Sequence, residues 1–311
     1  MLVGKVAYQV QNWPEYNQAL CHRGDITVWV EENTLESWYA DPQVGKHGAQ
    51  FLYNESAILC ALTLRAIYHL PLRQTRGFLT GIFKMMGLKL DIPCYTTLCR
   101  RAKDLDVQLP RSGKPAHIVI DSTGLKVFGE GEWKVRTHGV GKRRTWRKLH
   151  LAVNPDTHEI VAHALTTNDV HDNEVLPDLL AGVDDLESVA ADGAYDSHQS
   201  FDFIEQKGAI PLIPPREGAV IAQHGNSKQP CLARDEVVRA VKKQGKKKWK
   251  RESGYSRRSL AETAMFRVKQ IFGSKLRSRE FSRQSTESSI MCRALNLMTM
   301  IGMPVSVPRT V

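Results

Sequence analysis

The stretch from residue 117 to residue 215 alternates the sequence patterns of β-strands and α-helices, and this order limits the folds open to the chain. It begins with three strand-like runs, at residues 117–128, 147–156 and 159–168, and the last two are close enough to form a hairpin. The patterns that follow are a helix at 171–183, a strand at 187–196, a helix at 197–208 and a short, proline-broken strand at 209–215. This order predicts an α/β domain with a mixed sheet.

An aspartate interrupts the first of these strands. Asp121 lies inside the apolar run HIVIDSTGLKVF, residues 117–128. A carboxylate in poorly hydrated surroundings costs free energy unless hydrogen bonds or a cation compensate it. One interpretation is a hydrogen-bonded, purely structural aspartate, and the other is an acidic site built from several elements. Asp192, near the end of the strand at 187–196, is a second acid of this kind, and Asp196 is an alternative to it.

A third acid lies on a long amphipathic segment with the sequence YSRRSLAETAMFRVK, residues 255–269. At 100° per residue around an α-helix, the polar residues of this segment fall within one narrow stripe. They are Tyr255, Arg258, Glu262 and Lys269. The opposite side is apolar and carries Leu260, Ala261, Ala264, Val268, Ile271 and Phe272. A solvated polar face is the simpler interpretation of such a stripe, and a face presented to a ligand is the alternative.

The segment that leads into this helix is the most cationic of the chain. Residues 242–258 read KKQGKKKWKRESGYSRR, and the whole chain carries a formal net charge of +10 with a pI near 9.3. Dense positive charge predicts a polyanionic partner, and nucleic acid is the leading candidate. The rings of Trp133 and Trp249 could stack on a base displaced from a duplex, although anchoring of a loop is the simpler role for both.

The first 112 residues predict a mainly helical region. Patterns for two amphipathic helices end at Pro71 and at Gly87, and a third, shorter helix carries Arg100 and Arg101. Two compact helices, the second of them basic, fit a helix-turn-helix DNA reader at about residues 72–105. A plain helical bundle fits nearly as well.

Other features favour a cytosolic protein. The six cysteines are scattered, without the spacing of a zinc site, and we expect reduced thiols. The N-terminus lacks the pattern of a signal peptide. The apolar stretch at 290–307 is too short and too interrupted to span a membrane, so we expect a C-terminal helix on the core. A strand is expected at residues 26–30, where the sequence is ITVWV.

The polar stripe resembles a known signature. Its spacing, Y-x-x-R-x-x-x-E-x-x-x-x-x-x-K, matches the one found in DDE transposases of bacterial insertion sequences at every position. The order of strands and helices over residues 117–303 is similar to the RNase H-like fold of these enzymes. The resemblance implies an RNase H-like domain at 117–311, with a mixed sheet flanked by helices and a small basic insertion at about 218–254. A mainly helical region at 1–112, which binds DNA ends, would precede it.

The resemblance also implies three catalytic acids. In the family, the first aspartate lies on the first strand, the second follows the fourth strand and a glutamate lies on a later helix. Carried over to this chain, these acids are Asp121, Asp192 and Glu262. Carboxylates brought together from separate elements repel one another and need a cation, and hard oxygen ligands favour Mg²⁺, or Mn²⁺ in its place. We expect two ions, with Asp121 shared between them and the other two acids holding one each.

The partners implied by the resemblance are DNA molecules. The residues expected to contact DNA are Tyr255, Arg258 and Lys269, together with Trp249, Arg100 and Arg101. The enzyme would bind inverted-repeat ends as a homodimer, cleave them by metal-dependent hydrolysis and join the 3′-hydroxyl ends to target DNA. Such a protein would work in the bacterial cytoplasm, without a membrane, and associate with the nucleoid when bound to DNA. Two alternatives stay open: a non-catalytic DNA-binding regulator derived from a transposase, and an RNase H-like nuclease without strand transfer.

Overall fold

The computed structural model describes residues 8–41, 50–127, 146–223 and 231–309. The chain forms two compact units. The N-terminal unit consists of Met1–Leu105 together with Ala294–Val311, and the sheet unit consists of Asp106–Arg293. The sheet unit contains the predicted strands, whereas the end of the chain, from Ala294, belongs to the N-terminal unit.

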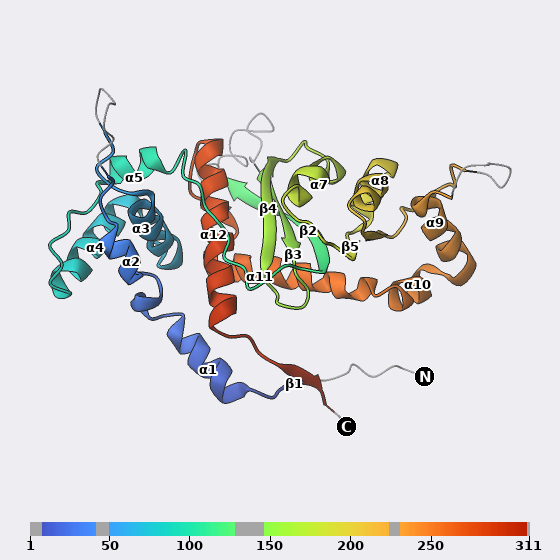
Figure 1. Cartoon of the computed structure of the whole chain (residues 1–311), viewed down its shortest axis with the longest axis horizontal. Helices are drawn as coiled ribbons and strands as arrows, with labels where there is room; N and C mark the ends of the chain where they lie inside the picture. The colour runs from blue at the N-terminus through green and yellow to red at the C-terminus, as the bar shows by residue number, and fades with distance from the viewer. Residues whose placement is uncertain (1–7, 42–49, 128–145, 224–230, 310–311) are drawn as a thin grey trace, which may run out of the picture. The chain divides into compact units, whose positions relative to one another are not determined.

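A mixed β-sheet forms the centre of the sheet unit (Figure 1). Its strands are β2 (His117–Val127), β3 (Trp146–Val153), β4 (Ile160–Thr167), β5 (Ser188–Ala190), β6 (Ile210–Leu212) and β7 (Lys275–Leu276). Five of them lie in the order β4-β3-β2-β5-β6, and β7 pairs with the far end of β2. The first three strands form an antiparallel meander, and β5 and β6 extend the sheet in parallel. This topology confirms the predicted RNase H-like mixed sheet.

Helices cover both faces of this sheet. On one face are α7 (Asp172–Leu180) and α8 (His198–Gln206), and on the other are α11 (Ser259–Phe272) and the first part of α12 (Phe281–Ile301). The helices α9 (Ala233–Gln244) and α10 (Lys246–Glu252) contact each other, and α9 also packs on α8. The segment at about 218–254, predicted to be a basic insertion, folds into α9 and α10 and leads directly to α11 (Figure 1). The predicted C-terminal helix forms, but it starts about two turns earlier than the apolar stretch suggested.

Successive side chains of β2 point to opposite faces of the sheet. Ile118 and Ile120 point into a core with residues of α7 and α8, such as Leu176 and Phe201, and all four are buried. Each such side chain contributes about 1.5–3 kcal/mol when fully removed from water. Asp121 is on the opposite face, toward α11. The strand therefore buries one face in the core and presents its aspartate on the other.

The N-terminal unit is mainly helical, as predicted. Its elements are β1 (Tyr8–Val10), α1 (Trp13–His22), a 3₁₀ turn (Ile26–Val28), α2 (Glu32–Glu36), α3 (Glu55–Ile67), α4 (Leu72–Met85), α5 (Tyr95–Arg101) and β8 (Ser306–Pro308). The two predicted amphipathic helices correspond to α3 and α4. The connection from α4 to α5, residues 86–94, is longer than the turn of a usual helix-turn-helix, so that motif stays a prediction.

The prediction of a strand at residues 26–30 was wrong, because Ile26–Val28 form a 3₁₀ turn. The Asp25 carboxylate accepts hydrogen bonds from the backbone N–H and the hydroxyl of Thr27, at 2.9 Å each, and caps the 3₁₀ turn. The indole of Trp29 donates to the carbonyl of Arg23 at 3.1 Å, and its ring is buried. These local hydrogen bonds outweigh the β-propensity of the ITVWV run.

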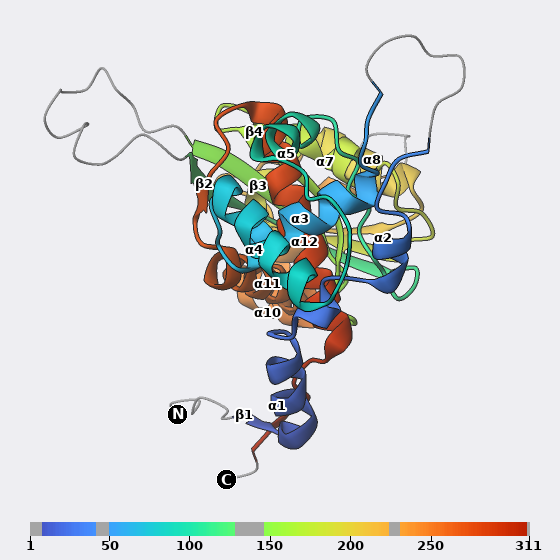
Figure 2. The same cartoon turned by 90° about the vertical axis from the view of Figure 1, so that its left-hand side faces the viewer.

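The two ends of the chain meet within the N-terminal unit. Strands β1 and β8 pair antiparallel, with Tyr8 opposite Pro308 (Figure 2). In the described part of the chain, no helix is long and apolar enough to cross a membrane.

Candidate active site

Asp121 lies on β2, on the face covered by α11. Its side chain is 16% exposed, and its Oδ1 accepts the backbone N–H of Ser122 at 2.9 Å. The apolar residues before it, from Ile118 to Ile120, are buried and fix the strand in the centre of the sheet. A carboxylate is thus placed at the edge of the core with access to solvent.

Asp192 follows β5, the strand parallel to β2. Val119 of β2 is opposite Ala190 of β5, and each aspartate comes two residues after its member of this pair. Parallel strands bring such positions to the same edge of the sheet. Asp192 caps the 3₁₀ turn Gly193–Tyr195, and its Oδ1 accepts the N–H of Ala194 at 2.9 Å.

Glu262 lies in the first turn of α11, just after a 3₁₀ turn, Tyr255–Arg258. Its side chain is 55% exposed and hydrogen-bonds to the Arg258 guanidinium. The same guanidinium pairs with Asp121, with Nη1 at 3.2 Å from Oδ2. Arg258 therefore bridges an acid on the sheet and an acid on the helix.

The charges of this site act on one another. Burial raises the pKa of Asp121, and the negative charges of Asp192 and Glu262 add to the rise, whereas Arg258 and the Ser122 N–H oppose it. Burial acts to lower the pKa of Arg258, but Tyr255 and the three carboxylates raise it overall. The Arg258 guanidinium thus contacts Asp121 and Glu262, and Asp192 lies close enough to act electrostatically on both Asp121 and Arg258.

Among the residues that the structure describes, no group of three or more His, Cys, Asp and Glu side chains is arranged so that it could hold a metal ion. Arg258 lies between Asp121 and Glu262. The donor set nevertheless fits a hard divalent cation in its chemistry, because all three acids offer carboxylate oxygens and carry more negative charge than one guanidinium balances.

A family model described as a transposase DDE domain matches residues 112–297, which include all three acids. The chain belongs to the transposase DDE domain family. A second model with the same description matches residues 21–130. Members of this family process nucleic acids, and such domains typically use divalent metal ions.

A solved structure of a Drosophila P element transposase strand transfer complex also matches. The alignment covers 86% of this chain and 84% of that chain, at 11% identity and a TM-score of 0.30. This similarity is too low to carry an argument about the site.

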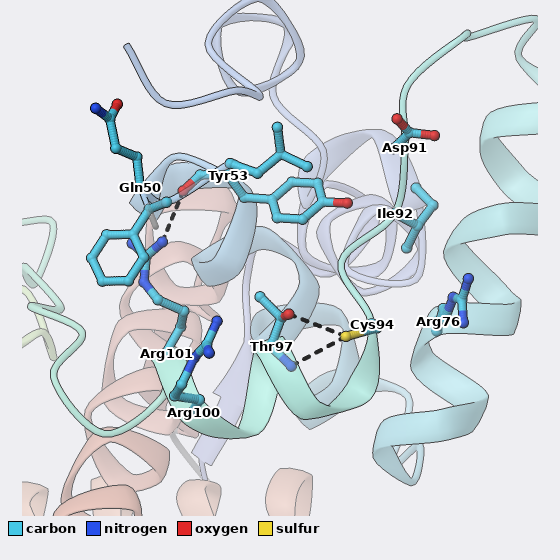
Figure 3. A pocket seen from close by; sticks show the side chains of 11 residues that line it. Gln50, Tyr53, Arg76, Asp91, Ile92, Cys94, Thr97, Arg100 and Arg101 are labelled. Atoms are coloured by element: carbon cyan, nitrogen blue, oxygen red, sulfur yellow. Dashed lines mark hydrogen bonds between the residues drawn. The ribbon is translucent and has the colours of Figure 1, made fainter. Parts of the chain in front are cut away.

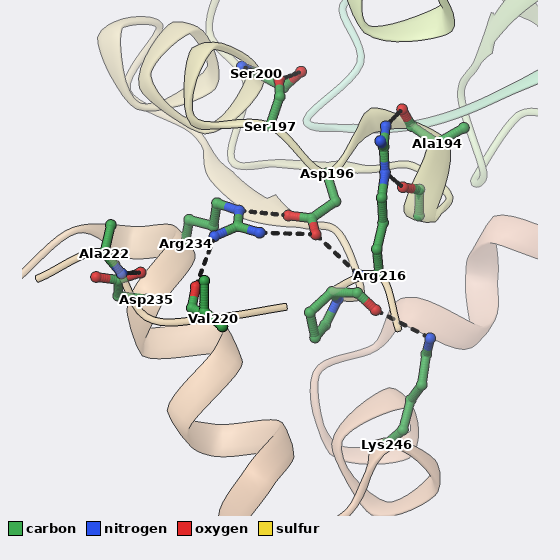
Figure 4. A network of polar contacts seen from close by, with 12 residues as sticks. Ala194, Asp196, Ser197, Ser200, Arg216, Val220, Ala222, Arg234, Asp235 and Lys246 are labelled. Atoms are coloured by element: carbon green, nitrogen blue, oxygen red, sulfur yellow. Dashed lines mark hydrogen bonds and ion pairs between the residues drawn. The ribbon is translucent and has the colours of Figure 1, made fainter. Parts of the chain in front are cut away.

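Asp196, the alternative to Asp192 in this transposase DDE domain, is already paired. Its side chain is 1% exposed and forms a bidentate ion pair with Arg234 of α9, at 2.7 and 3.1 Å (Figure 4). It also accepts the backbone N–H of Arg216 at 2.9 Å. Asp192 is therefore the better candidate for the second acid.

The Tyr255 to Lys269 segment is not one continuous α-helix, because its first turn is 3₁₀ and the α-helix begins at Ser259. Tyr255 and Arg258 still lie on one side, since a 3₁₀ turn stacks residues three apart, and the guanidinium is 5.8 Å from the ring centroid. The Tyr255 ring is buried and not presented to solvent. Lys269 is partly exposed, two turns after Glu262 on the same side of α11.

Stacking on a displaced base was one expectation for two tryptophans, Trp249 and Trp133. Trp249 was expected to stand beside DNA, but it is buried on α10, and its ring centroid lies 5.8 Å from that of Tyr255. Its packing anchors α10 to the turn that precedes α11, so contact with a base stays a prediction that requires the ring to leave this position. Trp133 lies outside the described residues.

The two arginines of α5 occupy different environments. Arg101 is 9% exposed, donates to the Tyr53 carbonyl at 2.8 Å and stacks on the Phe51 ring at 4.1 Å. Arg100 is exposed. Both line a cavity of about 450 Å³ within the N-terminal unit, to which Arg76 of α4 also contributes (Figure 3). Arg101 holds this unit together, and Arg100 is the better placed of the two to contact DNA.

A polar network behind the site was not predicted from the sequence. On the α7 face of the sheet, Ser122 donates to Asp172 at 2.8 Å, and Lys148 pairs with the same carboxylate at 3.0 Å. The buried ring of His150 lies 3.4 Å from the Tyr195 hydroxyl. Polar residues at alternate positions of β3 were the only sequence signal for it, and that pattern is equally typical of a solvated strand.

Proposed function

We propose that this chain is a transposase that binds inverted-repeat DNA ends, cleaves them by metal-dependent hydrolysis and joins the 3′-hydroxyl ends to target DNA. The observation that carries the proposal is that Arg258 contacts both Asp121 and Glu262, while the register of β5 on β2 brings Asp192 to the same edge of the sheet as Asp121. Membership of the family does not by itself identify the catalytic residues. Carboxylates brought together from separate elements repel one another and need a cation to balance them.

The three acids would hold two Mg²⁺ ions, with Mn²⁺ as a substitute, and Asp121 would be the shared ligand. Mg²⁺, when bound, would neutralise charge on the scissile phosphate. Asp121 is fixed by the sheet and Asp192 by its capping hydrogen bond, so both are positioned before DNA arrives. Preorganised charge of this kind contributes most of the rate in phosphoryl transfer.

Arg258 and Lys269 would contact the DNA backbone beside the scissile bond. In the present structure Arg258 balances Asp121 and Glu262. When a divalent cation takes over that balance, the guanidinium is free to turn its forked donors to a phosphate. Lys269, on the same side of α11, would supply a second positive charge.

DNA would also follow the basic surface that leads to α11. The exposed cationic side chains there are Lys242, Lys243, Lys246, Lys247, Lys248 and Arg251. Arg100 would contact DNA from the N-terminal unit. Two ends must be joined in a coordinated way, so we propose a homodimer on DNA, associated with the nucleoid of the cell.

The test is a Glu262→Gln variant, which keeps the size of the side chain and removes its charge. We expect cleavage of labelled end DNA with Mg²⁺ to fall at least about 100-fold, with end binding within about twofold of the native chain. Glu236→Gln, the same change on the exposed face of α9, is the matched control.

A supercoiled target plasmid in the same assay separates the alternatives. Joined product identifies a transposase, cleavage without joining identifies a nuclease, and binding without cleavage by the native chain identifies a regulator. Normal cleavage by Glu262→Gln would show that this residue is not a catalytic acid.

A further inference from the structure

The turn that carries Asp192 is held by Arg216, which lies just before the insertion at about 218–254. Arg216 donates from Nε to the carbonyl of Gly193 at 2.8 Å and from Nη2 to the carbonyl of Ala194 at 2.6 Å (Figure 4). Two consecutive carbonyls are thus fixed by one planar guanidinium. Its fork restricts the orientation of both peptide groups.

A second arginine holds the end of the same turn. Arg234, in the first turn of α9, pairs through both of its donors with Asp196, as described above. Asp196 also accepts the N–H of Arg216 at 2.9 Å, so one buried carboxylate connects the two arginine-bearing segments (Figure 4). A buried pair of this kind is costly to break, because removal of one partner leaves the other charge uncompensated.

These contacts reach the Asp192 carboxylate itself. Its Oδ1 accepts the N–H of Ala194, and the carbonyl of the same residue is held by Arg216. Loss of the guanidinium would free the peptide groups on both sides of Ala194, and with them the hydrogen bond that orients the carboxylate.

The helices of the insertion complete the arrangement. Lys246, the first residue of α10, donates to the carbonyl of Pro215 at 3.2 Å, next to Arg216. The turn is thus held by Arg216, just before the insertion, and by Arg234 on α9 within it. The exposed lysines lie on α9 and α10.

From this geometry we propose that Arg216 and Arg234 are positioning residues for Asp192, and that the insertion fixes the orientation of the second catalytic carboxylate. The inference rests on the proposed function, in which Asp192 is a metal ligand. Residues that orient a metal ligand typically change metal affinity 10- to 100-fold when removed.

The variants are Arg216→Ala and Arg234→Ala, with Arg234→Lys as the conservative change. Arg239→Ala is the matched control, because Arg239 is also on α9 but bonds to the carbonyl of Gln223 within the insertion. Amide hydrogen exchange of residues 193–197 reports the order of the turn without any catalysis. Electron paramagnetic resonance of Mn²⁺ added to the full chain bound to end DNA reports metal affinity.

We expect Arg216→Ala and Arg234→Ala to exchange these amides at least about tenfold faster and to bind Mn²⁺ about tenfold more weakly, with end binding unchanged. Arg234→Lys should recover part of both losses, because it keeps the charge but not the fork. Exchange and Mn²⁺ affinity that stay at native values in both alanine variants would overturn the proposal, as would equal losses in Arg239→Ala.

The two proposals fail differently. If the native chain does not cleave DNA, the proposed function is wrong, while the exchange measurement still tests whether the two arginines order the turn. If Glu262→Gln loses cleavage but the arginine variants keep native exchange and Mn²⁺ affinity, the function stands and the positioning role is wrong.

Discussion

At the scale of single residues, Arg258 is the counter-ion of the acidic site. It is 17% exposed, and its guanidinium contacts both Asp121 and Glu262. Burial raises the pKa of Asp121, and the charges of Asp192 and Glu262 add to the rise against the opposing effect of Arg258. The site is therefore a place where the chain gives up stability to keep charges together.

Replacement of Asp121 by asparagine should stabilise the metal-free protein. Because folding raises the pKa of Asp121 above its usual value of 3.8, the folded chain keeps this proton to higher pH than the unfolded chain does. Ionisation at higher pH therefore lowers the free energy of unfolding, and a neutral amide avoids that loss.

We expect the Tm of Asp121→Asn to exceed that of the native chain at pH 7 without divalent cations, and the difference to shrink as the pH approaches 4. Thermal unfolding followed by circular dichroism measures it. Asp202→Asn, on the exposed side of α8, is the control and should match the native chain. A lower Tm for Asp121→Asn at pH 7 would contradict the argument.

At the scale of elements, the short helix α5 carries two neighbouring arginines with different roles. One stabilises the fold and the other adds positive charge to the surface. Arg101 contacts the Tyr53 carbonyl, the Phe51 ring and, at 3.9 Å, the Glu55 carboxylate. Arg100 is its exposed neighbour.

Alanine at the two positions should therefore affect different properties: stability at Arg101 and DNA binding at Arg100. Arg101→Ala should lower the free energy of unfolding by about 1–3 kcal/mol, because the partly buried Tyr53 carbonyl loses its donor and the Phe51 ring loses its stacked cation. Arg100→Ala should change stability by less than about 0.5 kcal/mol, but weaken binding to end DNA and reduce the salt dependence of binding by about one ion. Fluorescence anisotropy at several salt concentrations, with urea unfolding, tests both, and unchanged affinity in Arg100→Ala would remove this residue from the DNA contacts.

At the scale of the whole molecule, the first and last segments of the chain fold as one structure. Asn12 donates from its amide to the Met303 carbonyl at 3.0 Å and accepts the N–H of Val305 at 2.7 Å. The backbone N–H of Gln11 adds a bond to the Val305 carbonyl at 2.8 Å. One side chain thus aligns β1 with β8.

Asn12→Ala should loosen this terminal pairing without disturbing the sheet unit. Two lost hydrogen bonds cost about 1–3 kcal/mol of local stability. We expect faster amide exchange at residues 8–10 and 305–307, and native exchange in β2 and β3. Gln18→Ala, at an exposed position of α1, is the control. Faster exchange throughout β2 and β3 would mean that the terminal pairing supports the whole molecule.

Local patterns in the sequence predicted the elements that hold the acids. The apolar run before Asp121, the hairpin after it and the stripe of Glu262 and Lys269 correspond to real strands and to α11, since periodicity reflects which side of an element faces the core. The sequence pattern gave wrong predictions where side-chain hydrogen bonds determine the backbone conformation, as at Asp25. It also failed where the exposure of a side chain depends on residues distant in the sequence. Trp249 and Arg101 were predicted to contact DNA, but both side chains are buried.

The sequence by itself determined the family and the order of the strands and helices, and it predicted the three candidate acids, because these depend on residue types and their spacing. Only the tertiary structure favours Asp192 over Asp196, since the pairing of Asp196 with Arg234 joins residues from separate elements. It also decided that Arg258 stands among the acids and that Arg216 and Arg234 hold the turn of Asp192. Such contacts depend on the register of β5 on β2 and on how the insertion packs, which no local pattern records.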